Sequence, residues 1–255
     1  MGRVNGRPRV GFTLLLVALM AGSYALDAQV TSDRLLRAAS EPHNWLTYGG
    51  TYTSQRYSTL DQITPANVAR LESKWVVQNQ VFGAWQSNPL VVDGMMYLTQ
   101  RPNDVMAVDA KTGSLYWLYR HTPSPDAKVC CGANNRGVAI LGDLVFMGTL
   151  DARLVAIDRV SGKARWNVAV GDVKAGYSIT MAPLVIKDKV LVGVGGGEFG
   201  IRGFIAAYDA KTGKLAWRFY VVPGDPAKPD GAASDRVLEE IARPTWIVCG
   251  METHV

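Results

Sequence analysis

The sequence predicts an all-β fold, a partial β-propeller with a few short helices. A unit of about fifty residues recurs from Pro89 onward, and such a period is typical of propeller blades. Each unit has room for four short strands separated by turns that contain glycine. In each unit an aspartate is followed eight residues later by a tryptophan: Asp109 and Trp117, Asp158 and Trp166, Asp209 and Trp217.

The turns that begin at the three aspartates have a physical basis. They read Asp-Ala-Lys-Thr-Gly at 109–113 and 209–213, and Asp-Arg-Val-Ser-Gly at 158–162. The aspartate can accept hydrogen bonds from the backbone ahead of it, and glycine supplies a positive φ angle. We expect each tryptophan to pack between neighbouring blades, because a blade cannot bury both faces alone. Three units, with Trp75 as a partial fourth, predict an incomplete ring, since closed propellers usually have about four to eight blades.

The residues before the repeats predict three local elements. A helix is expected at residues 31–39. A second helix is expected to begin at 63–68, with Thr64 as its N-cap. Hydrophobic and polar residues alternate at 71–78, and this alternation predicts a strand.

Residues 1–28 have the parts of a secretory signal peptide. Three arginines precede a short apolar core at 12–20, and small residues follow, with cleavage expected after Ala25 or Ala28. The core is short for a transmembrane helix, and an uncleaved membrane anchor is the alternative. Export would place the protein in an oxidising compartment, where a disulfide can persist.

The charge of the chain excludes one class of partner. The net charge is +5, and the three arginines and one aspartate of residues 1–28 account for +2 of it. The remaining lysines and arginines are scattered among acidic residues. Because a nucleic-acid surface needs clustered positive charge, we expect no nucleic-acid partner.

Cys130 and Cys131 are adjacent in the sequence. A disulfide normally joins Cα atoms about 4.4–6.8 Å apart, whereas neighbouring residues lie about 3.8 Å apart. A bond between them would close a small strained ring, and strain of this kind tends to occur at functional sites. The alternative is a pair of unpaired, buried thiols, which are common. The third cysteine, Cys249, is left over.

A glycine-rich stretch at 192–203 interrupts the third unit and contains Glu198. Clustered glycines allow a ligand to approach the backbone closely. A carboxylate among them could bind a hard cation such as Ca²⁺. The alternative is a flexible loop with a solvated glutamate. The stretch is not a dinucleotide-binding fingerprint, because no βαβ unit surrounds it.

Several segments together resemble one family, the pyrroloquinoline quinone (PQQ) dependent alcohol dehydrogenases of the methanol/ethanol type. The similarity runs from about Ser32 to Trp246. The paired cysteines and the Gly-Gly-Gly-Glu loop are specific in combination, whereas tryptophan repeats occur in many propellers. The matching segments are 44–50 (NWLTYGG), 60–64 (LDQIT), 129–132 (VCCG) with 136–137 (RG), and 195–203 (GGGEFGIRG).

The resemblance implies an eight-bladed propeller with PQQ on its axis, of which this chain would form about half. It also implies a metal ion beside PQQ, Ca²⁺ or a lanthanide, with Glu198 as a ligand. A cation there would polarise the quinone carbonyl. The matching cofactor-binding residues are Cys130 and Cys131, whose disulfide would cover one face of PQQ, Arg136, which would bond the quinone oxygens, Thr180, Gly196 and Gly197.

The chain departs from the family pattern in two places. Many relatives carry a glutamate where this chain has Gln86, which could still form a hydrogen bond to PQQ. Family members also continue past residue 255 and there supply a tryptophan, an asparagine metal ligand and the catalytic aspartate. We therefore assign no catalytic residue here, and expect the chain alone to be inactive. The predicted organisation is a signal peptide at 1–28, the N-terminal part of a propeller at 29–246 and an aberrant tail at 247–255.

The predicted function is PQQ- and calcium-dependent oxidation of alcohols in the periplasm. The resemblance implies a small alcohol as substrate and a cytochrome c-type electron acceptor, and an association with the membrane is left open. The alternative is a non-catalytic propeller scaffold or protein-binding module. The cysteine pair and Glu198 favour the enzyme, because a scaffold needs neither.

Overall fold

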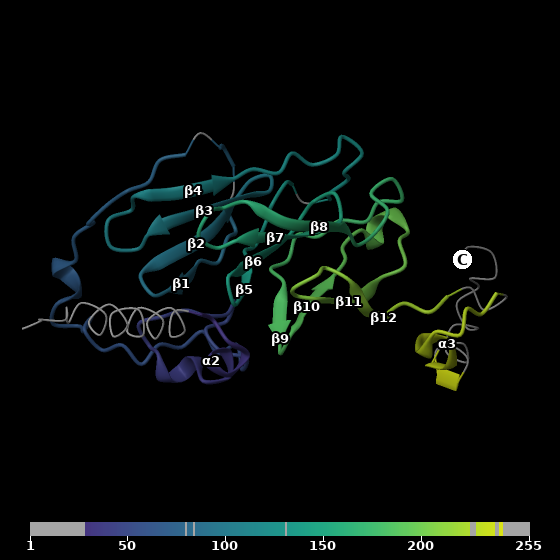
Figure 1. Cartoon of the computed structure of the whole chain (residues 1–255), viewed down its shortest axis with the longest axis horizontal. Coiled ribbons are helices and arrows are strands. Elements are labelled where there is room, and N and C mark those ends of the chain that lie inside the picture. The colour runs from purple at the N-terminus through teal and green to yellow at the C-terminus, as the bar shows by residue number, and fades with distance from the viewer. Residues whose placement is uncertain are drawn as a thin grey trace, which may run out of the picture.

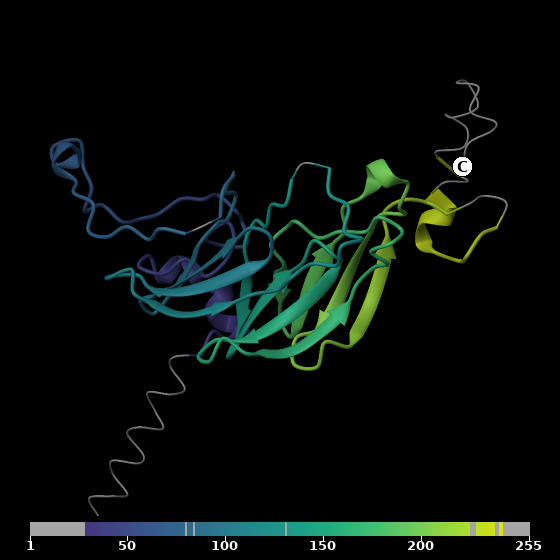
Figure 2. The same cartoon turned by 90° about the horizontal axis from the view of Figure 1, so that it is seen from above.

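Three antiparallel sheets of four strands follow one another along the chain and lie side by side (Figures 1 and 2). The computed structural model describes residues 29–79, 81–83, 85–130, 132–224, 228–237 and 240–241. In each sheet, neighbouring strands in the sequence are neighbours in space. The all-β prediction and the three repeats are thus confirmed. No described helix has the length and apolarity that crossing a membrane requires.

The strands match the predicted units, with one sheet to each unit. The first sheet consists of β1 (Leu90–Val92), β2 (Met95–Gln100), β3 (Asp104–Asp109) and β4 (Leu115–Tyr119). The second consists of β5 (Ala139–Leu141), β6 (Leu144–Gly148), β7 (Arg153–Asp158) and β8 (Ala164–Ala169). The third consists of β9 (Leu184–Ile186), β10 (Lys189–Gly193), β11 (Phe204–Asp209) and β12 (Leu215–Tyr220). One cluster of buried apolar side chains extends through all three sheets.

The described helices are short and lie outside the sheets. They are α2 (Ser32–Leu36), α3 (Ala233–Val237) and the 3₁₀ helices η1 (Ala38–Ser40), η2 (Val68–Arg70) and η3 (Gly197–Phe199). The first predicted helix is confirmed as α2 and η1, and Thr31 caps α2 because its hydroxyl accepts a hydrogen bond from the Arg34 amide at 3.1 Å.

The predicted turns are present between the third and fourth strands of every sheet. The carboxylates of Asp109, Asp158 and Asp209 each accept a backbone N–H from the residue three positions later, at 2.7, 2.8 and 2.9 Å. The glycines that end the turns have φ angles of 73°, 69° and 71°. Aspartate and glycine therefore act as the sequence predicted.

A repeated tryptophan contact joins each sheet to the next. Trp117 donates its indole N–H to the carbonyl of Arg159 at 2.9 Å, and Trp166 donates to Ala210 at 3.1 Å. Each indole ring lies against the glycine that ends the neighbouring turn. A Cβ atom at Gly162 or Gly213 would lie only 2.7 or 2.9 Å from the ring. The predicted packing of tryptophans between blades is confirmed.

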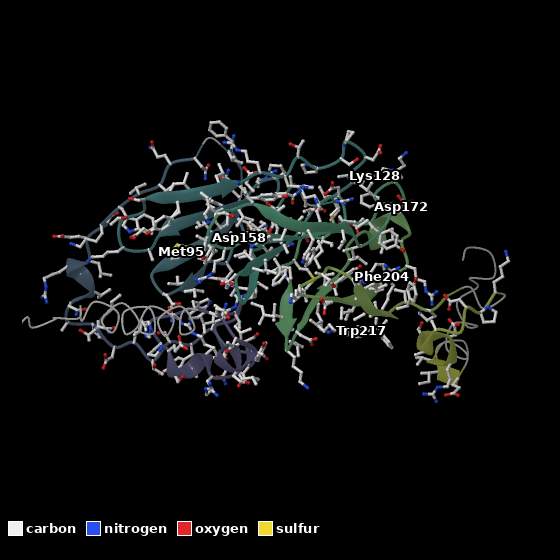
Figure 3. All side chains as sticks on the ribbon, viewed as in Figure 1. Met95, Lys128, Asp158, Asp172, Phe204 and Trp217 are labelled. Atoms are coloured by element: carbon white, nitrogen blue, oxygen red, sulfur yellow. The ribbon has the colours of Figure 1, made fainter. Side chains whose placement is uncertain are left out.

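Trp75 makes the same contact with the first sheet. Its indole N–H donates to the Ala110 carbonyl at 3.2 Å, and a Cβ at Gly113 would lie 2.7 Å from its ring. The equivalent residue of the third sheet, Trp217, lies on the edge strand β12 (Figure 3). It is 46% exposed, compared with 9% for Trp117. The face of the third sheet that carries Trp217 is therefore exposed, whereas the equivalent faces of the first two sheets are each covered by the next sheet.

Two predictions for the segment before β1 are wrong. Residues 71–79 are extended but form no strand, because no described strand lies beside them to accept and donate backbone hydrogen bonds. At 63–68 there is a turn, and η2 begins only at Val68. The Thr64 carbonyl accepts hydrogen bonds from the amides of Asn67 and Val68, and this carbonyl, not the side chain, is the group that joins the turn. Apolar side chains in this segment are exposed, such as Ile63 at 63%, so a longer helix here would have no surface to pack against.

The first strands of the sheets and the loops before them converge. β5 and β9 lie against each other. The amide of Asn88 donates to the carbonyl of Arg136 at 3.1 Å, and the amide of Arg136 donates to the carbonyl of Thr180 at 3.0 Å. This ladder brings together the residues that precede β1, β5 and β9.

A buried hydrogen bond between His121 and Asp151 anchors the long loop at 120–137, which carries the cysteine pair. His121 donates from Nε2 to the Asp151 carboxylate at 2.9 Å, and both side chains are about nine-tenths buried. The same carboxylate accepts from the Ser124 amide at 3.1 Å and the Thr149 hydroxyl at 2.6 Å. Burial alone would raise the pKa of Asp151, but the bonds from His121 and Thr149 outweigh it and lower the pKa to about 2.

Substituting Gly162 tests the contact between the sheets. Gly162→Ala would place a methyl group 2.7 Å from the Trp117 ring at a φ angle of 69°. Gly142→Ala, in the same sheet, meets a similar φ angle of 58° but no atom within 4 Å. We expect Gly162→Ala to lower the free energy of unfolding by about 1–3 kcal/mol more than Gly142→Ala. Equal losses in denaturant titrations would show that the ring contact is loose.

Substituting Asp151 tests the anchor of the loop. A folded-state pKa near 2, below the usual value, means that the carboxylate stabilises the fold above about pH 4 and loses this effect as the pH falls toward 2. Asp151→Asn should therefore cost about 2 kcal/mol near pH 5 and almost nothing at pH 2. Asp126→Asn, an exposed carboxylate of the same loop, is the control. A cost independent of pH would contradict this role of the carboxylate.

Candidate functional site

The loops that carry the predicted site residues lie on one side of the sheets (Figure 2). They are the loop at 120–137, the segments before β1 and β9, and the β10–β11 connection, which contains η3. The ladder from Asn88 through Arg136 to Thr180 holds three of these segments together. Residues that are more than forty positions apart are thereby neighbours.

Arg136 and Thr180 are in direct contact. A terminal nitrogen of the Arg136 guanidinium donates to the Thr180 hydroxyl at 2.7 Å, in addition to the backbone bond between the two residues. Both side chains are half-buried, so part of each faces solvent. A guanidinium has five N–H donors, and several remain after this bond to serve an oxygen-rich ligand.

Gln86 lies two residues before Asn88 and is exposed. The Asn88 amide donates to the Arg136 carbonyl, so Gln86 belongs to a segment that is joined to Arg136 two residues further along the chain. The backbone ladder therefore links the segment of Gln86 to Arg136 and Thr180, and the Gln86 side chain itself is exposed.

Glu198 lies beside Cys130. A side-chain hydrogen bond from Cys130 lowers the pKa of the Glu198 carboxyl below its usual value, so the group is a carboxylate at neutral pH. Both side chains are exposed. This contact joins the loop at 120–137 to η3, which belongs to another sheet. Cys131 lies outside the described residues, and so do the predicted signal peptide and the tail at 247–255.

The glycines around Glu198 have distinct roles. Gly196 has a φ angle of 123°, and a Cβ there would lie 2.2 Å from the Gly176 carbonyl, so only glycine fits. A Cβ at Gly197 would meet no atom within 4 Å. The backbone at Gly197 is therefore open to solvent on the side of its missing Cβ. Gly195 exchanges two backbone hydrogen bonds with Ser178, at 2.8 and 3.1 Å, which connects this loop to the segment of Thr180.

The residues present fit the predicted ligands in part. Arg136 and Thr180 offer donors to quinone oxygens, and Glu198 offers a hard oxygen ligand to a cation. The described residues include no group of three or more His, Cys, Asp or Glu that could hold a metal ion alone. Glu198 would therefore be one ligand of a set that the cofactor and other groups complete.

Three residues of the site region were missed by sequence reasoning. Arg101 donates from Nε to the Ala133 carbonyl at 3.1 Å and so supports the loop of the cysteines. His121 and Asp151 anchor the same loop, thirty positions apart in sequence. No local pattern marks such pairs, because each forms only when two sheets have packed.

A family model described as glucose/ethanol/alcohol dehydrogenase, β-propeller domain, with PQQ, matches residues 45–249. Quinohemoprotein alcohol dehydrogenase ADH-IIG from Pseudomonas putida is 43% identical, over 94% of this chain and 34% of its own length. The dehydrogenase subunit of alcohol dehydrogenase (quinone) from Gluconobacter oxydans is also 43% identical, over 80% of this chain and 28% of its own.

Solved structures agree with these relatives. The structure of ADHIIG from Pseudomonas putida HK5 superposes with a TM-score of 0.77 at 44% identity, over 82% of this chain and 31% of that one. A europium-containing methanol dehydrogenase gives a TM-score of 0.72 at 40% identity, over 76% and 34%. The chain spans about a third of the length of the relatives it matches. Because the family model covers most of the described residues, this chain belongs to the PQQ-dependent glucose/ethanol/alcohol dehydrogenase family with a β-propeller domain.

Proposed function

We propose that this chain forms part of a quinoprotein that oxidises alcohols, with PQQ as cofactor and Ca²⁺ or a lanthanide as metal ion. The observation that carries the proposal is the Arg136–Thr180 pair, in which a guanidinium on one loop donates to a hydroxyl on another at 2.7 Å and keeps further N–H donors for a ligand rich in oxygen. A non-catalytic scaffold has no need of this arrangement. The names of the relatives support the enzyme, and the europium in one of them supports a lanthanide as an alternative to calcium.

Several residues of the chain would together bind the cofactor and its cation. Arg136 and Thr180 would donate hydrogen bonds to oxygens of the cofactor and fix its orientation. The open backbone of Gly197 would let the cofactor approach the loop, and Glu198 would hold the cation beside it. PQQ, when bound, supplies the redox chemistry of alcohol oxidation. We assign the proton transfer from the alcohol to no residue of this chain.

The proposal extends to the place where the protein works. The predicted signal peptide at 1–28 supports export to the periplasm, and the similarity to quinohemoproteins supports a cytochrome c-type electron acceptor. An association with the membrane is compatible with both.

Export would allow Cys130 and Cys131 to form a disulfide that covers one face of PQQ. We expect the exported protein to gain two alkyl groups at these residues only after reduction, as measured by mass spectrometry. Alkylation of both thiols without a reductant would rule the disulfide out.

Substituting Glu198 tests the metal site in a chimera. This chain would replace the corresponding third of Pseudomonas putida ADH-IIG, and alcohol oxidation would be followed with a dye as electron acceptor. Glu198→Gln removes a charged ligand and should raise the Ca²⁺ concentration needed for half-maximal activity by about tenfold or more.

The control for this experiment is Glu72→Gln, which neutralises a glutamate that is 77% exposed in the segment before β1. It should leave the Ca²⁺ requirement unchanged. If Glu198→Gln also left the requirement unchanged, Glu198 would not be a metal ligand.

A further inference from the structure

The loop that carries Glu198 is held at both ends by different means. At its start, Gly195 is fixed to Ser178 by two backbone hydrogen bonds. Between its ends, Gly196 and Gly200 have φ angles of 123° and 78°, so the loop contains residues of high backbone freedom. Beyond the short turn of η3, its conformation depends on the far end, where Arg202 lies and the Gly203 carbonyl accepts from the Val221 amide at 3.0 Å.

Arg202 makes an unusually complete set of contacts for a side chain in a glycine-rich loop. Its backbone carbonyl accepts from the Tyr177 hydroxyl at 3.1 Å. Its guanidinium donates from Nε to the Val222 carbonyl at 2.8 Å and lies 4.0 Å from the centre of the Tyr220 ring. Only 21% of the side chain is exposed. These contacts fix the guanidinium to the end of β12 and to the residues after it.

Two carboxylates complete the set. Arg202 forms ion pairs with Asp230 and, at 3.5 Å, with Asp235, and it donates to the Ser234 hydroxyl at 3.3 Å. Asp235 also accepts from the amides of Asp230 and Gly231, at 3.1 and 3.0 Å. The acidic residues are thus ordered by their own segment, in and before α3. They hold Arg202 by charge as well as by geometry.

The direction of Arg202 matters for Glu198, four residues earlier. An unpaired guanidinium on the same loop would be a natural partner for the Glu198 carboxylate and would compete with a cation for it. Here the guanidinium is engaged by Asp230 and Asp235, and Glu198 faces Cys130 instead. The segment after β12 therefore neutralises the nearest arginine of the loop and leaves the glutamate available.

We propose that Arg202 is a positioning residue for Glu198, and that Asp230 and Asp235 act through it. The ion pairs order the loop at 195–203 before a hard cation binds, so the cation meets a carboxylate already in place. Ordering a loop in advance raises affinity because less conformational entropy is lost on binding. The inference rests on the proposed function for its ligand, but the ordering of the loop can be measured separately.

Hydrogen–deuterium exchange of the full chain tests the ordering. Arg202→Gln should speed exchange of the amides at 195–203 by about tenfold, with no change in β5–β8. Arg202→Lys keeps a charge toward the carboxylates but loses the Nε donor and the planar stack on Tyr220, so it should restore part of the protection. Arg165→Gln is the control, because it removes the same charge from an exposed ion pair with Asp158 in the second sheet.

Terbium binding to the chimera with Pseudomonas putida ADH-IIG, loaded with PQQ and followed by sensitised emission, tests the consequence for the cation. Arg202→Gln and Asp235→Asn should weaken Tb³⁺ binding by about tenfold, Arg202→Lys less, and Arg165→Gln not at all. Unchanged exchange at 195–203, or faster exchange throughout the three sheets, would overturn the positioning role. Faster exchange in the loop with unchanged Tb³⁺ affinity would also overturn it. If the PQQ-loaded chimera gave no emission that depends on Glu198, the metal site of the proposed function would fail, and the exchange data would still decide whether Arg202 orders the loop.

Discussion

The contact between an indole ring and a glycine in the neighbouring turn is the constraint on which the arrangement of the sheets depends. It occurs three times, at Trp75, Trp117 and Trp166, and each time the indole N–H also bonds to a carbonyl of that turn. The ring can approach because the glycine has no Cβ, and the glycine has the positive φ angle that closes the turn. One contact therefore fixes both the distance and the orientation between sheets.

That orientation brings the first strands together and so assembles the candidate site. Arg136 and Thr180 meet through a backbone ladder that exists only because β5 and β9 lie against each other. Glu198 reaches Cys130 because its loop is tied to Ser178, in the segment that leads to Thr180. The positions of the site residues thus depend on packing at the opposite ends of the strands. A change at a tryptophan distant from the site would move the loops that carry it.

The sequence was sufficient to predict the sheets but not all of their surroundings. Aspartate, glycine and tryptophan recur at the same spacing in each sheet, so the sequence alone predicted the three units and their turns. Alternation at 71–78 predicted a strand wrongly, because hydrophobic alternation carries no information on whether a partner strand is present. The cysteine pair and Glu198 were singled out by local pattern, whereas the roles of Arg136 and Thr180 came from the resemblance. The contacts of Asp151 and Arg202 join residues about thirty positions apart and left no signal in the sequence.

The central claim is that loops from three sheets form one binding surface for PQQ, with Arg136 at its centre. A titration of the purified chain with PQQ, followed by tryptophan fluorescence, tests it most directly. The account predicts saturable binding that Arg136→Gln weakens by about tenfold or more, since it removes charged donors. Arg153→Gln, which alters an arginine bonded to Asn167 in the second sheet, should leave the affinity unchanged. Equal affinities for the unmodified chain and Arg136→Gln, or no binding to either, would contradict the account.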